Sequence, residues 1–211
     1  MMIIKKTDRE SVVKVADCLK NGGIAVLPTD TVYGFSAVVD LKNMAKKETD
    51  ARIRAIKGRA ETKPFIELIA RPEDIQKYTA DRIPAELLSK WPGPLTVIVT
   101  LKDDCPLDTN LKTVAFRCPG DAWLRNIIDI VGAPIYSTSV NRSGRPVLDA
   151  IPAISAEFGN EVDLIVDGGA TQKNALPSTI VSVEEGHIKI VRQGATRFSN
   201  ARFSNAQLTV F

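Results

Sequence analysis

Short apolar runs that are typical of strands alternate with helical patterns along most of this 211-residue chain. Residues 95–101 form the clearest strand pattern, and residues 122–131 carry apolar side chains at helical spacing. Further strands are indicated at residues 24–27, 35–39 and 113–117. Because strands and helices are interleaved throughout, we predict an α/β or α+β fold built on a mixed sheet.

Local signals predict the other elements. Residues 7–10 match a capping box that opens a helix, and residues 21–23 supply its C-terminal stop. Residues 179–183 and 187–191 flank a short polar turn, a pattern typical of a β-hairpin. The remaining predicted elements are helices at residues 43–57, 72–78, 84–90 and 154–158 and strands at residues 65–70, 134–136 and 164–166.

One domain is predicted over residues 1–195, followed by a C-terminal tail over residues 196–211. No linker rich in glycine, proline or serine divides the chain, and its composition does not change at mid-length. The tail contains a short repeat, Arg197-Phe198-Ser199-Asn200 and Arg202-Phe203-Ser204-Asn205, whose period is too short for a solenoid. We expect the tail to be a mobile or surface-docked extension.

The composition indicates a soluble globular protein of a reducing compartment. Hydrophobic residues make up 44% and charged residues 25%, and the net charge of +3 is too small to indicate nucleic-acid binding by itself. The cysteines Cys18, Cys105 and Cys118 form no CxxC pair, so neither a zinc site nor a disulfide framework is predicted. No apolar run approaches the roughly 20 residues that span a membrane. A cytoplasmic location without membrane contact is therefore expected.

The first candidate binding segment follows the predicted strand at residues 24–27. Pro28-Thr29-Asp30-Thr31-Val32-Tyr33-Gly34 places hydroxyls, a carboxylate, a phenol and a glycine in one turn. Ligand-binding groups are concentrated in such loops on rigid scaffolds. An ordinary polar turn that caps a helix is the alternative interpretation.

A second segment, Ile56-Lys57-Gly58-Arg59 followed by Lys63-Pro64, lies where a predicted helix meets a loop. Its two cations flank a glycine, so the backbone can approach a ligand while both side chains turn toward it. Cations in such a loop can clamp a polyphosphate. The alternative is a basic helix C-terminus that complements the helix dipole.

Two further segments are rich in hydrogen-bond donors. Residues 137–144, Ser-Thr-Ser-Val-Asn-Arg-Ser-Gly, follow a short strand and could contact phosphate and ribose oxygens. In the predicted hairpin, Arg192 lies near the level of Ser178 and Thr179 and could reach a phosphate or carboxylate. A polar turn and a plain hairpin with a rim arginine are the alternatives.

Several common catalytic patterns do not occur in the sequence. It contains no GxxxxGK[ST] loop, no GxGxxG and no GxSxG elbow, and His187 is its only histidine. Chemistry would therefore depend on hydroxyls, cations and a metal ion carried by the substrate. Group transfer at phosphorus fits this set, because positioning and charge stabilisation do most of its catalysis.

Taken together and in order along the chain, these segments resemble the YrdC-like family, the threonylcarbamoyl-AMP synthases of tRNA modification. The chain looks like the short, single-domain form of that family. Ala60 stands where the family usually has proline, and Val140 where it usually has alanine. The matching segments are Pro28–Gly34, Lys57–Arg59, Trp91–Thr96, Arg117–Pro119, Ser137–Gly144, Pro177–Ile180 and Arg192–Ala195.

The resemblance implies a nucleotidyltransferase that makes threonylcarbamoyl-adenylate and pyrophosphate from L-threonine, bicarbonate or carbon dioxide, and ATP. A partner transferase would then modify adenosine 37 of tRNA. The resemblance also implies an α/β fold with a twisted mixed sheet and flanking helices around a concave basic cavity, and a tendency to bind double-stranded RNA.

It also implies roles for individual residues. Lys57 and Arg59 would be catalytic by neutralising charge on the phosphates, with Mg²⁺ carried by ATP and not by protein side chains. ATP would contact Lys57, Arg59, Ser139, Asn141, Ser178, Thr179 and Arg192. Threonine would contact Thr31, Tyr33 and Arg117, with Arg117 holding its carboxylate in a fork.

Three other interpretations use the same residues. The first is a non-catalytic module that binds double-stranded RNA or tRNA in the basic cavity. The second is the carbamoyl-adenylate step of hydrogenase maturation, which normally comes with CxxC pairs that this chain lacks. The third is a regulatory relative that only binds nucleotide.

Overall fold

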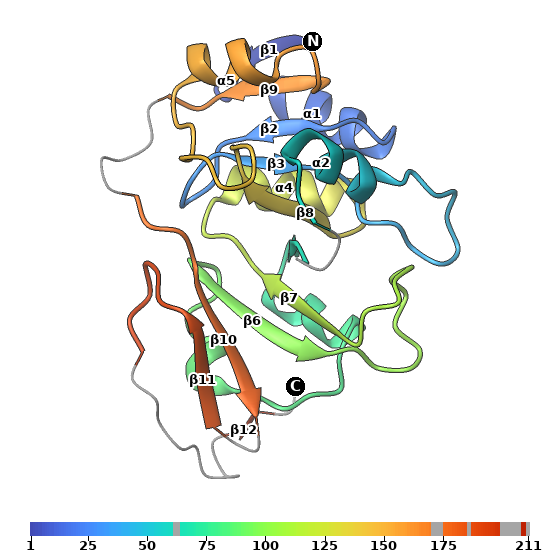
Figure 1. The fold of residues 1–211 in the computed structure, drawn as a ribbon. Coiled ribbons are helices and arrows are strands. Elements are labelled where there is room, and N and C mark those ends of the chain that lie inside the picture. Colours follow the sequence, from blue (N-terminus) through green and yellow to red (C-terminus); the bar gives the residue numbers. More distant parts are fainter. Residues whose placement is uncertain (61–63, 170–174, 185–186, 199–207, 210–211) are drawn as a thin grey trace.

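The computed structural model describes residues 1–60, 64–169, 175–184, 187–198 and 208–209, and most of them belong to one mixed α/β fold (Figure 1). The main sheet consists of β1 (Met2–Lys5), β2 (Ala25–Leu27), β3 (Gly34–Ser36), β4 (Ile66–Leu68), β6 (Leu95–Thr100), β7 (Thr113–Arg117), β8 (Ile135–Ser139), β9 (Leu164–Asp167), β10 (Thr179–Glu184) and β11 (His187–Arg192). The helices are α1 (Ser11–Lys20), α2 (Thr49–Lys57), α3 (Ala85–Leu88), α4 (Ala122–Val131), α5 (Ile151–Phe158) and the 3₁₀ helix η1 (Pro72–Lys77). The predicted fold class is confirmed.

The 10-stranded sheet has the order β1-β9-β2-β3-β8-β4-β7-β6-β10-β11 and mixes parallel with antiparallel pairs. We call the first half of the sheet the strands β1, β9, β2, β3 and β8, and the second half the strands β4, β7, β6, β10 and β11. In Figure 1 the strands of the first half run across the upper part of the molecule, whereas β6, β10 and β11 descend obliquely through the lower part. The twist thus turns the two halves to different directions.

The first half of the sheet is covered on both faces. Leu27 of β2 packs in a cluster with residues of α1 and α4, whereas Val26 packs in a separate cluster with residues of α2 and α5. β9 alternates in the same way, with Val166 in the first cluster and Ile165 in the second. Strands buried on both faces are apolar at consecutive positions, which explains the continuous apolar runs in the sequence.

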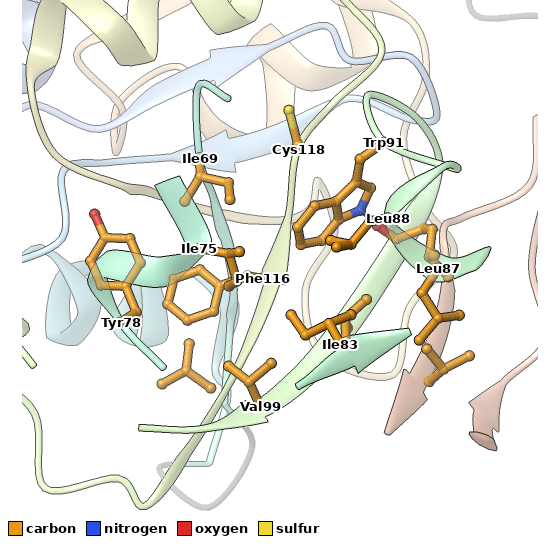
Figure 2. Close-up of a cluster of buried hydrophobic side chains, with 14 of the residues drawn as sticks. Ile69, Ile75, Tyr78, Ile83, Leu87, Leu88, Trp91, Val99, Phe116 and Cys118 are labelled. Atoms are coloured by element: carbon orange, nitrogen blue, oxygen red, sulfur yellow. Dashed lines mark hydrogen bonds between the residues drawn. The ribbon is translucent and has the colours of Figure 1, made fainter. Parts of the chain in front are cut away.

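One face of the second half carries another apolar cluster, shown in Figure 2. Tyr78, at the end of η1, stacks on Phe116 of β7 with ring centroids 4.9 Å apart. Trp91 also packs here and donates its indole N–H to the carbonyl of Leu95 at 2.7 Å. Because side chains alternate along a strand, Arg117, which follows Phe116, points to the opposite face.

Several predicted elements are confirmed and others are wrong in their limits. The hairpin is present as β10 and β11, and Asp121 caps α4 by accepting the N–H of Trp123 at 3.0 Å. The capping box at residues 7–10 is wrong, because α1 begins after Glu10 without a side-chain cap. The helix predicted from residue 43 begins only at Thr49, since the Asp40 carboxylate accepts two backbone N–H groups of the loop before it.

The tail makes one described strand contact. β12 (Leu208–Thr209) pairs antiparallel with β5 (Ile83–Pro84), and Phe198 packs against the cluster of Figure 2. Residues 199–207, which hold most of the predicted repeat, lie outside the described residues, as does Lys63. The division at residue 195 stays a prediction. No helix in the described ranges is long and apolar enough to span a membrane.

One buried acidic group interrupts the apolar interior. Glu67 of β4 lies opposite Phe116 of β7 and Tyr136 of β8 in the sheet register. It is 4% exposed, and its Oε2 atom has no hydrogen-bond partner in the part of the chain that the structure describes. Burial raises the pKa of the Glu67 carboxyl to about 8, so this group is protonated at neutral pH.

We expect Glu67→Gln to flatten the pH dependence of stability. Between the ordinary pKa of 4.5 and about 8, the folded chain holds a proton on Glu67 that the unfolded chain releases. This group therefore makes the free energy of unfolding fall with rising pH, by about 1.4 kcal/mol per pH unit near the middle of that window. Urea unfolding at pH 5.5, 6.5 and 7.5 measures the slope. The exposed Glu86→Gln should keep the wild-type slope, and an unchanged slope in Glu67→Gln contradicts the prediction.

Candidate functional site

A cavity of about 380 Å³ lies on the side of the sheet to which Arg117 points. Its wall is formed by the loop between β2 and β3, the segment before β4, the end of β8, the segment before β10 and the end of β11. Most of the predicted site residues line it, namely Thr31, Tyr33, Arg59, Arg117, Ser139, Ser178 and Arg192. Lys57, Asn141 and Thr179 are not among the residues that line it.

Strand pairing brings these distant parts of the sequence together. β3 and β8 pair with Gly34 opposite Ser139. β10 lies beside β6 with Ile180 opposite Thr96, and the hairpin then sets Arg192 opposite Ile180. The candidate segments thus meet at one cavity because their strands are neighbours in the sheet.

Arg117 is the most completely engaged cation of the cavity wall. Its guanidinium donates to Asp30 Oδ1 at 2.5 Å, to Thr31 Oγ1 at 3.0 Å and to the carbonyl of Gly93 at 3.1 Å. The side chains of Arg117 and Asp30 are 5% and 19% exposed. The other oxygen of Asp30 accepts the N–H of Gly120 at 2.9 Å. This network holds the loop after β2 against the ends of β7 and β6.

Within the described residues, three of the five N–H donors of Arg117 are used in this network, and one on each terminal nitrogen is left for a ligand. Arg117 can therefore donate two hydrogen bonds to a ligand carboxylate. That carboxylate would lie beside the carboxylate of Asp30, which already pairs with Arg117. The sequence prediction did not include Asp30 among the site residues. Its place within the Pro28–Gly34 segment was the available signal.

The opposite wall is built around Ser178. Arg192 donates from Nη2 to the Ser178 carbonyl at 2.8 Å and to its hydroxyl at 3.2 Å, and Thr96 shares a 2.8 Å hydrogen bond with the same hydroxyl. Burial, and then the neighbouring charge of Arg117, lower the pKa of Arg192. Two guanidinium groups in a partly dry cavity create a positive potential that favours an anion.

Thr179 has a structural part in this wall. Its hydroxyl donates to the Thr196 carbonyl and accepts the N–H of Gly194 at 2.9 Å. A Cβ atom at Gly194 would lie 2.2 Å from the carbonyl oxygen of Pro177, so only glycine fits there. Thr179 and Gly194 together fix the segment after β11 against the segment before β10.

Lys57 holds the backbone at the end of β8. Its side chain is buried, and its ammonium donates to the carbonyls of Ser139 and Asn141 at 2.5 and 2.9 Å and to Asn141 Oδ1 at 3.0 Å. Burial and the charge of Arg59 lower the pKa of Lys57 to about 8, which leaves it mostly charged at neutral pH. The predicted clamp of Lys57 with Arg59 on one ligand is therefore not formed in this structure.

The amide of Asn141 is equally committed to its own loop. Its Oδ1 atom also accepts the Ser139 hydroxyl at 2.7 Å, and its amino group donates to the carbonyls of Arg142 and Arg145. Asn141 and Lys57 thus shape the loop that presents Ser139 to the cavity. Hydrogen bonding to a fixed backbone is a role that spacing in the sequence does not reveal.

Arg59 and Tyr33 complete the wall. Arg59 donates to the Pro64 carbonyl at 3.0 Å and lies over the ring of Phe65, and burial lowers its pKa. Tyr33 is buried, and its hydroxyl donates to the Gly169 carbonyl at 2.7 Å, which makes it a rigid part of the pocket. Phe65 and Val147 also line the cavity, although the sequence analysis did not include them. They supply apolar surface beside the cations.

Comparison with known proteins gives one consistent family. The sequence profile of the family described as Telomere recombination, Sua5/YciO/YrdC, matches residues 17–194. Over 185 residues the chain is 32% identical to a threonylcarbamoyl-AMP synthase of Pyrococcus abyssi, covering 85% of this chain and 52% of the relative. Over 197 residues it is 29% identical to a putative threonylcarbamoyl-AMP synthase of Methanocaldococcus jannaschii, covering 90% and 91%. The chain thus spans about half of the first relative and most of the second.

Solved structures agree with this family. The fold is similar to that of Pyrococcus abyssi Sua5 complexed with L-threonine, with a TM-score of 0.79 and 30% identity, covering 92% of this chain and 58% of that one. It is also similar to Escherichia coli YciO, with a TM-score of 0.76 and 22% identity, covering 93% and 95%. The second likeness bears on the fold alone.

We expect Asp30→Ala to destabilise the protein by about 2 to 3 kcal/mol. The change leaves Arg117 buried without its ionic partner, and the partial exposure of Asp30 keeps the loss below that of a completely buried pair. Asp129→Ala is the matched control, because its pair with Arg71 is about half exposed and should contribute less than about 1 kcal/mol. Urea unfolding of both variants measures the difference. Equal losses would contradict a structural role for the buried pair.

Proposed function

Because the chain belongs to the Sua5/YciO/YrdC family, we propose that it is an L-threonylcarbamoyladenylate synthase. It would join L-threonine, bicarbonate or carbon dioxide, and ATP into threonylcarbamoyl-AMP and release pyrophosphate, as a nucleotidyltransferase. The observation that carries this proposal is the single cavity in which Arg59, Arg117 and Arg192 meet the hydroxyls of Thr31, Ser139 and Ser178. One cavity can therefore accept a polyphosphate and an amino acid side by side.

The phosphates would lie on the side of Arg59, Arg192 and Ser178. Burial removes part of the solvent around both guanidinium groups and lowers their pKa. A bound phosphate anion would stabilise these charges in place of the lost solvent. Ser139 adds a hydroxyl from the opposite loop. Mg²⁺ brought with ATP would supply further positive charge against the phosphates.

Threonine would lie on the side of Arg117. The two unused N–H donors of Arg117 would bind its carboxylate, while Thr31, which accepts from Arg117, and the fixed ring of Tyr33 would shape the pocket. Asp30 sets the position of Arg117. We therefore propose Asp30 as a positioning residue for threonine binding.

The proposed reaction has two steps. The lone pair of the neutral threonine amine forms an N–C bond to carbon dioxide and the amine loses a proton to solvent, which gives a carbamate; from bicarbonate, that proton and the displaced hydroxide leave together as water. A carbamate oxygen then attacks the α-phosphorus of ATP, and the bond to the pyrophosphate oxygen breaks. Negative charge moves to pyrophosphate, where Arg59 and Arg192 would stabilise it. The adenylate would pass to a transferase that modifies position 37 of tRNA.

Lys57 and Asn141 would act indirectly in this scheme, by holding the loop of Ser139. Thr179 would act in the same way on the segment that carries Arg192. This is a revision of the direct ATP contacts predicted for these three residues.

The activity is tested by incubating the protein with ATP, bicarbonate and single amino acids. We expect pyrophosphate release that requires L-threonine, and a threonylcarbamoyl-AMP product in the mass spectrum. Release of pyrophosphate without an amino acid requirement, or RNA binding with no turnover, would contradict the proposal and favour a binding module.

We expect Arg59→Ala to reduce the rate of pyrophosphate release about ten- to a hundredfold, because one charge-assisted contact to the transferring group is lost. Arg71→Ala removes an exposed arginine outside the cavity and should leave the rate near that of the wild type. Steady-state pyrophosphate assays compare the two. Near-normal turnover of Arg59→Ala would remove this residue from the phosphate site.

Lys57→Ala should lower both turnover and stability, whereas Arg59→Ala should lower turnover alone. The physical reason is that the buried Lys57 bonds three oxygens of the Ser139 loop, whereas Arg59 lies in the cavity wall. Thermal unfolding beside the pyrophosphate assay separates the two effects. A Lys57→Ala variant with wild-type stability and strongly reduced turnover would restore the direct contact predicted from the sequence.

A further inference from the structure

A second and larger cavity of about 680 Å³ lies on the other side of Arg59 and Phe65, which line both hollows. Its wall comes from α2, from β4 and β8, from Asp40, and from the loop that holds Asp108 and Leu111. The proposed synthase reaction uses none of its residues except Arg59. The cavity is therefore a separate place at which a ligand could bind.

Glu67 lies in the wall of this second cavity and has a buried oxygen that lacks a hydrogen-bond partner among the described residues. This oxygen is Oε2, and the carboxyl group is nine-tenths buried or more. Leaving a buried polar atom without a partner costs free energy that a ligand donor would restore. Tyr136, opposite Glu67 in the sheet, lines the cavity beside it.

The two arginines of this cavity have other partners. Arg54 donates to Asp50 at 3.4 Å and to the Ala60 carbonyl at 3.0 Å, and its guanidinium lies 4.5 Å from the ring centroid of Phe65. Arg59 donates to Pro64 and lies over the other part of the same aromatic wall. Both cations are thus directed toward Phe65 and its loop.

The remaining charges of the cavity are acidic and lie on separate elements. Asp40 accepts the N–H groups of Lys47 and Glu48, Asp50 pairs with Arg54, and Asp108 pairs with Lys46. With Glu67, these make four carboxyl groups against two guanidinium groups in the wall. Among the described residues, no three acidic, histidine or cysteine side chains are grouped to hold one metal ion. Spaced carboxyl groups match a cation whose charges are also spaced.

We propose that this second cavity binds an aliphatic polyamine, with one ammonium group at Glu67 and the next at the acidic rim of Asp40 and Asp108. An ammonium group has three donors and no acceptor, so it would satisfy Oε2 of Glu67. The ring of Tyr136 attracts cations and also covers methylene groups, whereas both guanidinium groups of the cavity already lie at the ring of Phe65. Leu111 adds apolar surface at the rim.

The pH dependence of binding follows from the state of Glu67. Its pKa is raised to about 8, and a bound ammonium group favours the ionised form, so binding at pH 7 should release a proton. Affinity should therefore rise between pH 6.5 and 8.5. The titratable and charged groups that face Glu67 across this cavity are Asp40, Asp50, Arg54, Arg59, Asp108 and Tyr136.

Isothermal titration of the full chain with spermidine, without ATP or threonine, tests the proposal. We expect one saturable site, with proton release seen as a dependence of the heat on the ionisation enthalpy of the buffer. Glu67→Gln should weaken binding at least tenfold and abolish the proton release. Glu86→Gln, an exposed change on α3, should bind like the wild type.

A second variant keeps the test decisive if Glu67→Gln fails to fold. Asp108→Asn removes a rim carboxylate and should weaken spermidine binding about threefold without changing the proton release. Equal affinity of the wild type and both variants would overturn the proposal. So would displacement of spermidine by an equimolar amount of MgCl₂, because any cation would then suffice. Since these measurements need no turnover, they are independent of the proposed synthase activity.

Discussion

The buried pair of Arg117 and Asp30 is the contact on which the arrangement of the cavity depends. Arg117 comes from β7 in the second half of the sheet, whereas Asp30 belongs to the loop between β2 and β3 in the first half. The pair therefore joins the two halves of the sheet in one wall of the cavity, and further hydrogen bonds to Thr31 and Gly93 fix the direction of Arg117. A buried pair of this kind is valuable mainly for placing its neighbours, since desolvation offsets much of its attraction.

The cavity exists because the two halves of the sheet are covered differently. Helices pack on both faces of the first half, whereas the cluster around Phe116 and Trp91 covers one face of the second half. Alternation along β7 then sends Arg117 to the other face, where Ile180 of β10 also lies. Polar and charged side chains can remain there beside water. Glu67 differs from these side chains, because it is a polar residue that is buried in the sheet beside the second cavity.

Much of this was predictable from the chain alone. Apolar periodicity indicated the mixed α/β class, the β10–β11 hairpin and α4, and the ordered segments indicated the family. The predicted site residues that line the cavity include cations whose affinity for anions is obvious from the sequence, such as Arg59 and Arg192. The ATP contacts of Lys57 and Asn141 stay predictions, but the structure shows both side chains bonded to backbone carbonyls and to each other. The sequence does not show that backbone carbonyls, rather than a ligand, accept the hydrogen bonds of these side chains.

The sequence by itself determined which groups are available: hydroxyls and cations that follow short strands, in an order typical of one family. Tertiary structure alone decided which of the remote segments meet, because strand order places residue 180 beside residue 96 and residue 34 beside residue 139. It also decided that Asp30 neutralises part of Arg117 and that Glu67 has an oxygen without a partner. Both outcomes depend on burial and on distances between remote segments, and neither quantity is encoded in local spacing.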